Sequence, residues 1–249
     1  GITITLNSNM EYWKNRVAVV TGAAHGIGAQ IAEDLAKIGM VVIGFEPTLE
    51  RVNEMLSKVD DWGNVEGQLV PCKCDVSKDE DLKHAFEGIV AAYGGVDVLI
   101  NNAAIGKEGL ISTGKIQDLT DVTDTNIYGL LTCTRYAIES MVKKNVPGQI
   151  ININSICGHY MPPFHEPKIN MYIASKRTMT VLNTLLKNEF KCLNRKIKVT
   201  TCDSINSLTE TTSDEPKLRL KDVAKLVRLI LNTPEHLQVH EVLLDNVVE

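Results

Sequence analysis

The chain has 249 residues, of which 44% are hydrophobic and 23% are charged, and its formal net charge is -5 at pH 7. This composition is typical of a globular protein, and the length is sufficient to bury a large core. We expect neither nucleic acid nor a membrane as a partner, because the basic residues form no long block and no apolar run approaches the roughly 18 residues of a membrane span.

Residues 1–9 lack the basic start and the long apolar stretch of a signal peptide, and Met10 follows them. We expect Met10 to be the native start, residues 1–9 to be an added or upstream extension, and residues 10–249 to form a single domain. Predicted strands cover residues 17–21, 40–45, 68–72, 96–100, 149–153, 197–202 and 239–244. Predicted helices cover residues 27–38, 49–59, 79–93, 120–144, 171–193 and 221–231.

The predicted strands are rich in Val and Ile and show no polar alternation, which is typical of a parallel sheet that is covered on both faces. Alternation of strands and helices predicts an α/β fold with a single doubly wound, Rossmann-like parallel sheet. Two irregular stretches, residues 158–167 and 204–217, follow strand ends, where such sheets bind ligands. The second stretch is either a mobile substrate lid or a solvated surface loop.

Six cysteines lie mostly in apolar strand or helix patterns. Cys72 and Cys74 could suggest a metal site, but alternate residues of a strand point to opposite faces and no CxxC motif or histidine partner follows. We therefore expect free, mostly buried thiols, no bound metal, and a reducing, cytoplasmic compartment.

Three glycines lie in the turn after the first predicted strand. Gly22 allows the tight turn, Gly26 lets the backbone approach a pyrophosphate, and Gly28 lets the following helix pack closely on the sheet. The N-terminus of that helix supplies N–H donors and a partial positive charge to phosphates. Because this GxxxGxG pattern lies between a strand and a helix, it predicts a dinucleotide-binding turn rather than a chance glycine cluster.

Glu46 follows the second predicted strand, where an acid can accept hydrogen bonds from the hydroxyl groups of an adenosine ribose. No arginine follows immediately, so a 2′-phosphate would meet a carboxylate without a guanidinium, and we expect NAD rather than NADP. His25 is the opposing signal, because a protonated histidine attracts an additional phosphate. The alternative for Glu46 is a solvated turn residue.

Tyr172 and Lys176 are four residues apart and share one face of a predicted helix. A free tyrosine has a pKa of about 10, and the positive charge of a neighbouring lysine favours the ionised form. Such a pair can transfer a proton. Ser155, at the end of the fifth predicted strand, can donate a hydrogen bond to a substrate oxygen on which charge develops.

Taken in order, these segments resemble the short-chain dehydrogenase/reductase family, from Tyr12 to the C-terminus. The matching segments are residues 21–28 (TGAAHGIG), 74–76 (CDV), 101–104 (NNAA), Asn126, Ser155 and residues 172–176 (YIASK). Residues 132–137, 150–159 and 239–241 are most similar to insect farnesol-dehydrogenase-like members.

The resemblance implies an oxidoreductase that transfers a hydride between a nicotinamide cofactor and an apolar alcohol, aldehyde or ketone. It implies that Asn126, Ser155, Tyr172 and Lys176 are catalytic, with Asn126 holding a water and Lys176 also binding the nicotinamide ribose. The implied cofactor contacts are Gly22, His25, Gly26, Ile27, Gly28, Glu46, Asp75, Val76, Asn102, Ala103, Ala104, Tyr172, Lys176 and Thr209. Family members pair through two long helices, here residues 120–144 and 171–193, so a homodimer or homotetramer is implied.

The chain departs from the family pattern at two places. Ala104 stands where the usual motif is Asn-Ala-Gly, and its methyl group is expected to crowd the nearby backbone slightly. Ser204 and Ile205 occupy the usual Pro-Gly positions, which changes the allowed backbone angles near the expected nicotinamide pocket. Two alternatives therefore remain, an NADP-dependent carbonyl reductase and a catalytically weakened nucleotide-binding or scaffold protein.

The stretch after Ser155 is rich in apolar residues, Tyr160 and residues 161–164 among them. Such a lining suits an apolar substrate, although apolar loop residues are as often packing anchors. We expect His159 and His165 to shape this loop rather than to act in catalysis.

Overall fold

The computed structural model describes residues 10–59, 62, 63, 65–160, 170–204 and 218–245. The strands are β1 (Val17–Thr21), β2 (Val41–Glu46), β3 (Gln68–Lys73), β4 (Val98–Asn101), β5 (Gly148–Ser155), β6 (Ile197–Ser204) and β7 (Glu241–Leu244). The helices are α1 (Gly26–Lys37), α2 (Leu49–Val59), α3 (Asp79–Tyr93), α4 (Ile116–Thr123), α5 (Leu130–Lys144), α6 (Asn170–Cys192) and α7 (Leu220–Leu231). A π-helix, η3 (Asp124–Gly129), and two 3-10 helices, η1 (Met10–Trp13) and η4 (Ile156–Gly158), complete the described elements.

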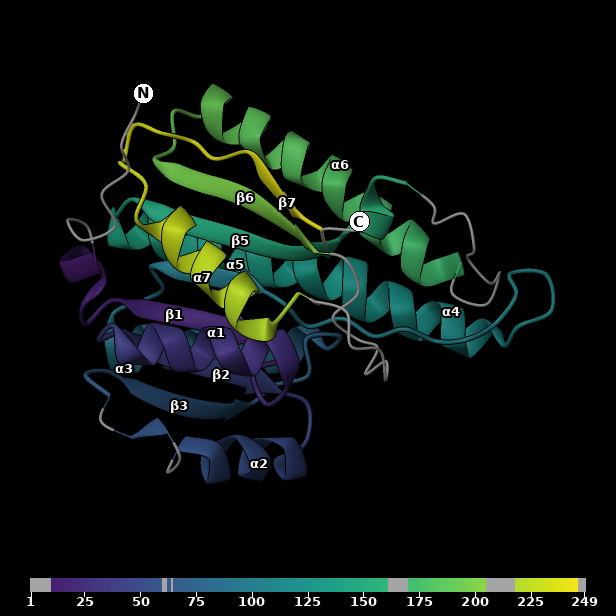
Figure 1. Ribbon diagram of the computed structural model, residues 1–249, viewed down its shortest axis with the longest axis horizontal. Coiled ribbons are helices and arrows are strands. Elements are labelled where there is room, and N and C mark those ends of the chain that lie inside the picture. The colour runs from purple at the N-terminus through teal and green to yellow at the C-terminus, as the bar shows by residue number, and fades with distance from the viewer. Residues whose placement is uncertain (1–9, 60–61, 64, 161–169, 205–217, 246–249) are drawn as a thin grey trace.

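The strands form one seven-stranded sheet in the order β3-β2-β1-β4-β5-β6-β7 (Figure 1). Every pairing in it is parallel. The chain starts at the centre with β1, moves outward to β3, and then returns to β4 on the other side of β1. This reversal of strand order is the doubly wound topology, and it confirms the predicted α/β fold.

Helices cover both faces of the sheet, as the uniformly apolar strands predict. In Figure 1, α1 and α7 lie in front of the sheet and α5 lies behind it. One apolar layer joins the first face to α1, α2 and α7, with Met55 and Val227 among its buried residues. The other joins the second face to α3, α5 and α6, with Phe86 and Phe190 among its members. Burial on both sides leaves the ends of the strands as the place where polar groups can gather.

A buried carboxylate anchors the end of the sheet at which β1 begins. Asp97 is 1% exposed and accepts hydrogen bonds from the backbone N–H of Val17 at 2.9 Å and from Lys144 at 2.7 Å. Arg16 adds a third contact at 3.2 Å. A carboxylate this deeply buried is tolerated because two cations and a backbone donor satisfy it.

Most predicted elements match the structure within one or two residues, but the predicted helix over residues 120–144 does not. It begins earlier, at Ile116, and is interrupted by η3 between α4 and α5. Such π-turns are rare single-turn features within helices, and the sequence analysis did not predict this one. The interruption lies where the side chain of Asn126 bonds to the backbone of Ile105, in the segment after β4.

Two of the strands extend further than predicted, toward the end of the sheet where ligands bind. β5 and β6 run to Ser155 and Ser204, which are paired with each other in the register of the two strands. All six cysteines are free, and Cys74, Cys133, Cys157 and Cys202 are buried, which confirms the expected thiols. No helix in the described part of the chain has the length and apolar character needed to cross a membrane.

Candidate active site

A cleft of about 410 Å³ opens at the carboxyl ends of the central strands. It collects most of the residues that the sequence indicates for a cofactor and for catalysis. These residues are Gly22, His25, Gly26, Ile27, Glu46, Asp75, Val76, Asn102, Ala103, Ala104, Ser155, Tyr172 and Lys176. The roles of these residues stay predictions, but the residues line one cleft and could therefore act together on one bound molecule.

The remaining predicted residues lie elsewhere. Gly28 and Asn126 are buried and are not part of the wall of this cleft. Thr209 lies outside the described residues, as do Ile205, His165 and most of the two irregular stretches, residues 161–169 and 205–217. The predictions that concern a lid, an apolar loop and the replaced Pro-Gly therefore remain predictions.

The glycine turn has the backbone geometry of a phosphate-binding loop. Gly22 and Gly26 have φ angles of 67° and 53°, in the left-handed region that favours glycine. A Cβ atom at Gly26 would meet nothing within 4 Å, so the backbone there borders open space. His25 is the N-cap of α1 and provides no side-chain cap, which leaves the first-turn N–H groups without that partner. These features fit the pyrophosphate of a dinucleotide.

Gly28 allows α1 to pack closely against this turn. A Cβ atom at Gly28 would lie 2.0 Å from the carbonyl oxygen of Gly22 and 2.4 Å from Nδ2 of Asn102. That Nδ2 donates hydrogen bonds to the carbonyl oxygens of Thr21 at 2.9 Å and Gly22 at 3.0 Å. Asn102 thus ties the segment after β4 to the turn after β1, and Gly28 allows α1 to approach both. Ala104 is exposed, and the expected crowding by its methyl group stays a prediction.

Glu46 is not a solvated turn residue, because it is only 5% exposed. Its Oε1 accepts a hydrogen bond of 2.6 Å from the backbone N–H of Ala24, inside the glycine turn. Burial raises the pKa of Glu46, and the bond from Ala24 opposes that rise. The carboxylate is therefore held at the end of β2 and on the wall of the cleft, as predicted.

Arg51 is a cleft residue that the sequence analysis missed. It comes from α2, five positions beyond Glu46, yet it lines the same cleft. Its guanidinium lies 2.6 Å from Nδ1 of His25, and Nε2 of His25 lies 2.8 Å from Glu54. A guanidinium therefore stands close to Glu46, although none follows it directly in sequence. Arg51 reaches the cleft because the chain turns into α2 after β2. The sequence contains no local motif that predicts this position.

Tyr172 and Lys176 lie together on one face of α6, as their spacing predicts. The Nζ atom of Lys176 is 5.6 Å from the centre of the Tyr172 ring. Burial raises the pKa of Tyr172, the nearby Cys157 thiol adds to the rise and hydrogen bonding with Ser155 opposes it, so that the pKa is about 12. The expectation that Lys176 shifts Tyr172 toward its ionised form is therefore wrong for this structure. Desolvation of the phenol is the largest cause of the rise.

Lys176 is itself buried, with 3% of its surface exposed, and its Nζ donates a hydrogen bond of 3.1 Å to the carbonyl oxygen of Ile153. Burial lowers the pKa of Lys176 to about 8, whereas the charges of Asp203 and Cys157 raise it. The side chain thus remains largely protonated at neutral pH, because that pKa is still above 7. It provides a fixed positive charge at the floor of the cleft.

The side chain of Asn126 connects the segment after β4 with α6 through hydrogen bonds. Its Oδ1 accepts from the N–H of Ile105 at 2.8 Å, and its Nδ2 donates to the carbonyl of Ile105 at 2.9 Å. The same Nδ2 lies 3.0 Å from the hydroxyl of Ser175, which precedes Lys176. The side chain therefore fixes the segment after β4 against α6, and both segments carry cleft residues.

Replacement of Lys176 by Met is expected to raise the free energy of unfolding by about 2 kcal/mol at neutral pH. The difference between a pKa of about 8 in the fold and the ordinary 10.5 corresponds to about 3 kcal/mol. Loss of the bond to Ile153 offsets about 1 kcal/mol of that. Because the pKa is depressed in the fold, the unfolded chain binds more protons between about pH 8 and 10.5. The wild type therefore gains stability as the pH rises through that window, and the advantage of the variant disappears.

Urea denaturation at about pH 7 and about pH 10 measures this difference. Lys191→Met, at an exposed position of the same helix, is the matched control and should show no change in relative stability between the two pH values. If Lys176→Met is less stable than the wild type at both pH values, burial does not penalise the lysine charge.

A glycine-rich turn before α1, a carboxylate at the end of β2, and a buried Tyr–Lys pair beside a serine together define a nucleotide-binding oxidoreductase. Comparison with known proteins agrees with this class. The family model described as short chain dehydrogenase matches residues 16–217, and the chain belongs to that family.

Among curated proteins, farnesol dehydrogenase from Aedes aegypti is 39% identical to this chain, over 96% of this chain and 99% of that protein. Dehydrogenase/reductase SDR family member 11 from Mus musculus is 35% identical, over 94% and 95% of the two chains. A crystal structure of a metagenomic short-chain oxidoreductase in complex with NADP is 26% identical and superposes with a TM-score of 0.79, over 95% of this chain and 99% of that one.

Proposed function

We propose that this protein is an NAD(H)-dependent alcohol dehydrogenase/carbonyl reductase whose catalytic residues are Tyr172, Lys176 and Ser155, with Asn126 as a positioning residue. The observation that carries the proposal is the presence of Ser155, Tyr172 and Lys176 on the wall of the cleft that also holds the glycine turn. A dinucleotide whose pyrophosphate lies at that turn extends along the cleft toward these residues.

A nicotinamide cofactor, when bound, supplies or accepts the hydride. The residues of the chain then have to hold the substrate oxygen and move its proton. Tyr172, with a pKa of about 12, is protonated at neutral pH and is ready to donate to a carbonyl oxygen that gains a hydride. Ser155 donates a second hydrogen bond to that oxygen, and Lys176 stabilises the tyrosinate that forms.

Asn126 is proposed to position rather than to contact the substrate. Its side-chain amide is engaged by Ile105 and Ser175. A water that connects Lys176 with solvent would therefore be held by the backbone of η3, where a π-turn rearranges the carbonyl groups. Asn126 maintains that backbone geometry.

An apolar alcohol or carbonyl compound is the proposed substrate. Apolar side chains of Ile105, Ile153 and Leu220 line the cleft, and apolar pockets select such compounds. The 39% identity to a farnesol dehydrogenase supports an isoprenoid alcohol or the corresponding carbonyl compound. A screen of such alcohols and aldehydes against short polar ones tests this, and equal turnover of both classes would refute it.

NAD is the proposed cofactor because Glu46 is fixed in the cleft by Ala24 and would repel a 2′-phosphate. The wild type is expected to bind NADH at least about tenfold more tightly than NADPH, which is about 1.4 kcal/mol. Glu46→Gln should reduce this preference by weakening NADH and strengthening NADPH. Fluorescence titration of each protein with both reduced cofactors measures the four dissociation constants.

Arg51 provides the control, because it favours the second candidate, an NADP-linked carbonyl reductase. Arg51 places a positive charge on the rim of the cleft beside His25, although Glu54 partly neutralises it. With NAD as the cofactor, Arg51→Gln should change NADH affinity by less than about threefold. Tighter NADPH binding in the wild type, lost in Arg51→Gln, would establish the NADP-linked enzyme and refute the NAD proposal. If neither cofactor binds, the scaffold protein becomes the better description.

We further propose that the protein is a cytoplasmic homodimer or homotetramer that pairs through α5 and α6. Leu131 on α5 and Val181 and Leu185 on α6 are exposed, with Val181 54% and Leu185 56% accessible. Exposed apolar residues on two long helices support a contact between copies. Light scattering that shows a monomer would contradict this.

A further inference from the structure

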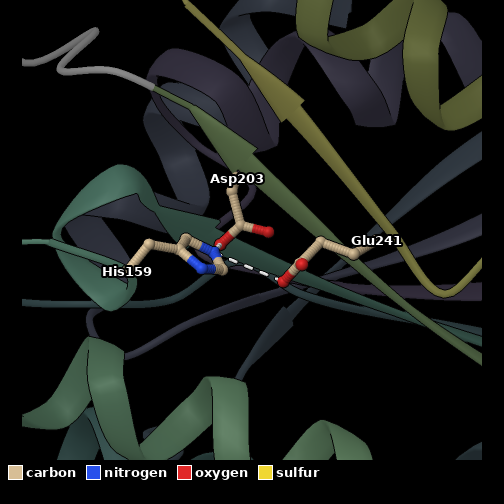
Figure 2. Close-up of side chains that lie close together, drawn as sticks. All are labelled: His159, Asp203 and Glu241. Atoms are coloured by element: carbon tan, nitrogen blue, oxygen red, sulfur yellow. Dashed lines mark ion pairs between the residues drawn. The ribbon is translucent and has the colours of Figure 1, made fainter.

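Three side chains that could bind a cation meet beside β6, outside the candidate active site. His159 follows η4, Asp203 lies in β6, and Glu241 is the first residue of β7. Figure 2 shows the imidazole of His159 pointing between the two carboxylates. Its Nε2 lies 3.0 Å from Oδ1 of Asp203 and 3.3 Å from Oε1 of Glu241. None of the three residues lines the cleft of the candidate active site.

Asp203 is unusual because its side chain is completely buried while one of its oxygens has no partner. The residue is 0% exposed, and its Oδ2 atom makes no hydrogen bond. The Nε2 atom of His159 is also buried, and neither of its two short contacts has the geometry of a hydrogen bond. An unpaired buried acceptor costs about 1–3 kcal/mol, and more when it is charged. The buried Oδ2 of Asp203 and the buried Nε2 of His159 therefore each lack a hydrogen-bond partner.

The spacing of the three groups is that of ligands around one ion. Tetrahedral zinc with bonds of about 2.0–2.1 Å separates its ligand atoms by about 3.3 Å. The two contacts of Nε2 are close to this value, and one ligand atom from each residue lies within 4.8 Å of the others. An imidazole nitrogen with two carboxylates suits a first-row transition metal better than Mg²⁺ or Ca²⁺, which prefer oxygen ligands only.

Outer contacts hold the buried ligands in place. Asn154, paired with Asp203 in the register of β5 and β6, donates a hydrogen bond of 2.7 Å to Oδ1 of Asp203. The guanidinium of Arg177 binds the carbonyl oxygens of Gly158 at 2.9 Å and His159 at 2.7 Å. Metal ligands are commonly oriented by such second contacts. Glu241 is the accessible member, with 42% of its side chain exposed, and leaves a route for the ion.

We propose that His159, Asp203 and Glu241 bind one divalent transition-metal cation of the zinc type. The ion satisfies the buried oxygen of Asp203 and joins η4, β6 and β7, three segments that are distant in sequence. The sequence analysis expected no metal, because it examined only local spacing around cysteines. The competing description is a protonated His159 that forms an ion pair with both carboxylates and binds no metal.

Isothermal titration of the full-length, chelator-treated protein with Zn²⁺ alone tests the proposal. We expect one Zn²⁺ per chain with a dissociation constant in the micromolar range or tighter, and at least tenfold weaker binding by Asp203→Asn. Glu241→Gln is a second variant at an exposed position, where the fold should be retained, and it should weaken binding by a similar factor. No saturable binding by the wild type, or wild-type affinity in both variants, would overturn the proposal in favour of the ion pair.

Two controls exclude other zinc ligands. His84→Gln removes an exposed histidine beside the acidic first turn of α3 and should leave the affinity and stoichiometry unchanged. Titration with Co²⁺ should give weak visible absorption bands, as expected for nitrogen and oxygen ligands. An intense thiolate charge-transfer band would instead assign the binding to cysteines such as Cys72 or Cys192 and refute the proposed site.

Discussion

Tyr172→Phe is expected to reduce kcat by at least about a thousandfold, within the range that general acid–base groups contribute. NADH binding should change by less than about twofold. The variant loses only the hydroxyl, while the ring keeps its contacts with the buried side chains of Ile156, Cys157 and Ile173. Steady-state kinetics with the best substrate of the screen, together with a fluorescence titration, separates the effect on chemistry from the effect on binding.

Tyr160→Phe is the matched control, because Tyr160 is an exposed tyrosine that does not line the cleft. It should retain wild-type kcat. Turnover that persists in Tyr172→Phe would reject the catalytic assignment, and NADH binding that is lost with turnover would show that Tyr172 acts through the structure of the cleft.

Gly28→Ala should weaken NADH binding at least about tenfold and lower the free energy of unfolding by about 3 kcal/mol, at the upper end for an overpacked site. The added Cβ would lie 2.0 Å from the carbonyl oxygen of Gly22. That oxygen belongs to the backbone, so relief requires α1 to move away from the turn after β1. The same movement displaces Gly26 and the N–H groups that are proposed to bind the pyrophosphate.

Gly88→Ala is the control for this substitution. Gly88 lies within α3, and a Cβ there would meet nothing within 4 Å. This variant should be more stable than the wild type by up to about 1 kcal/mol, because alanine is the better helix former. NADH titration and urea denaturation of both variants provide the comparison. Unchanged NADH affinity in Gly28→Ala would mean that the turn does not bind the cofactor.

The fold was predictable because its signals are local. Uniformly apolar runs such as Val17–Thr21 are typical of strands covered on both sides, and the pattern from Gly26 to Lys37 fits one helix face. Once the strands are parallel, their carboxyl ends share an edge. That is why Glu46, Ser155 and the glycine turn could be assigned to one site from sequence alone.

The parts that sequence analysis missed depend on contacts between distant segments. Arg51 reaches the cleft only because α2 turns back beside His25. The pKa of Tyr172 depends on how deeply the phenol is buried, and residue spacing does not report that depth. Asp203 finds its partners in residues from two other segments, and no local motif connects them.

The two outer strands of the sheet bear on how copies of the protein can associate. β3 contains Pro71, which has no N–H to offer a further strand, and β7 is only four residues long. Neither edge strand is well suited to pair with a strand of another molecule, so extension of the sheet from molecule to molecule is disfavoured. The proposed assembly is therefore expected to use helical surfaces, where closed symmetric complexes form more readily than fibres.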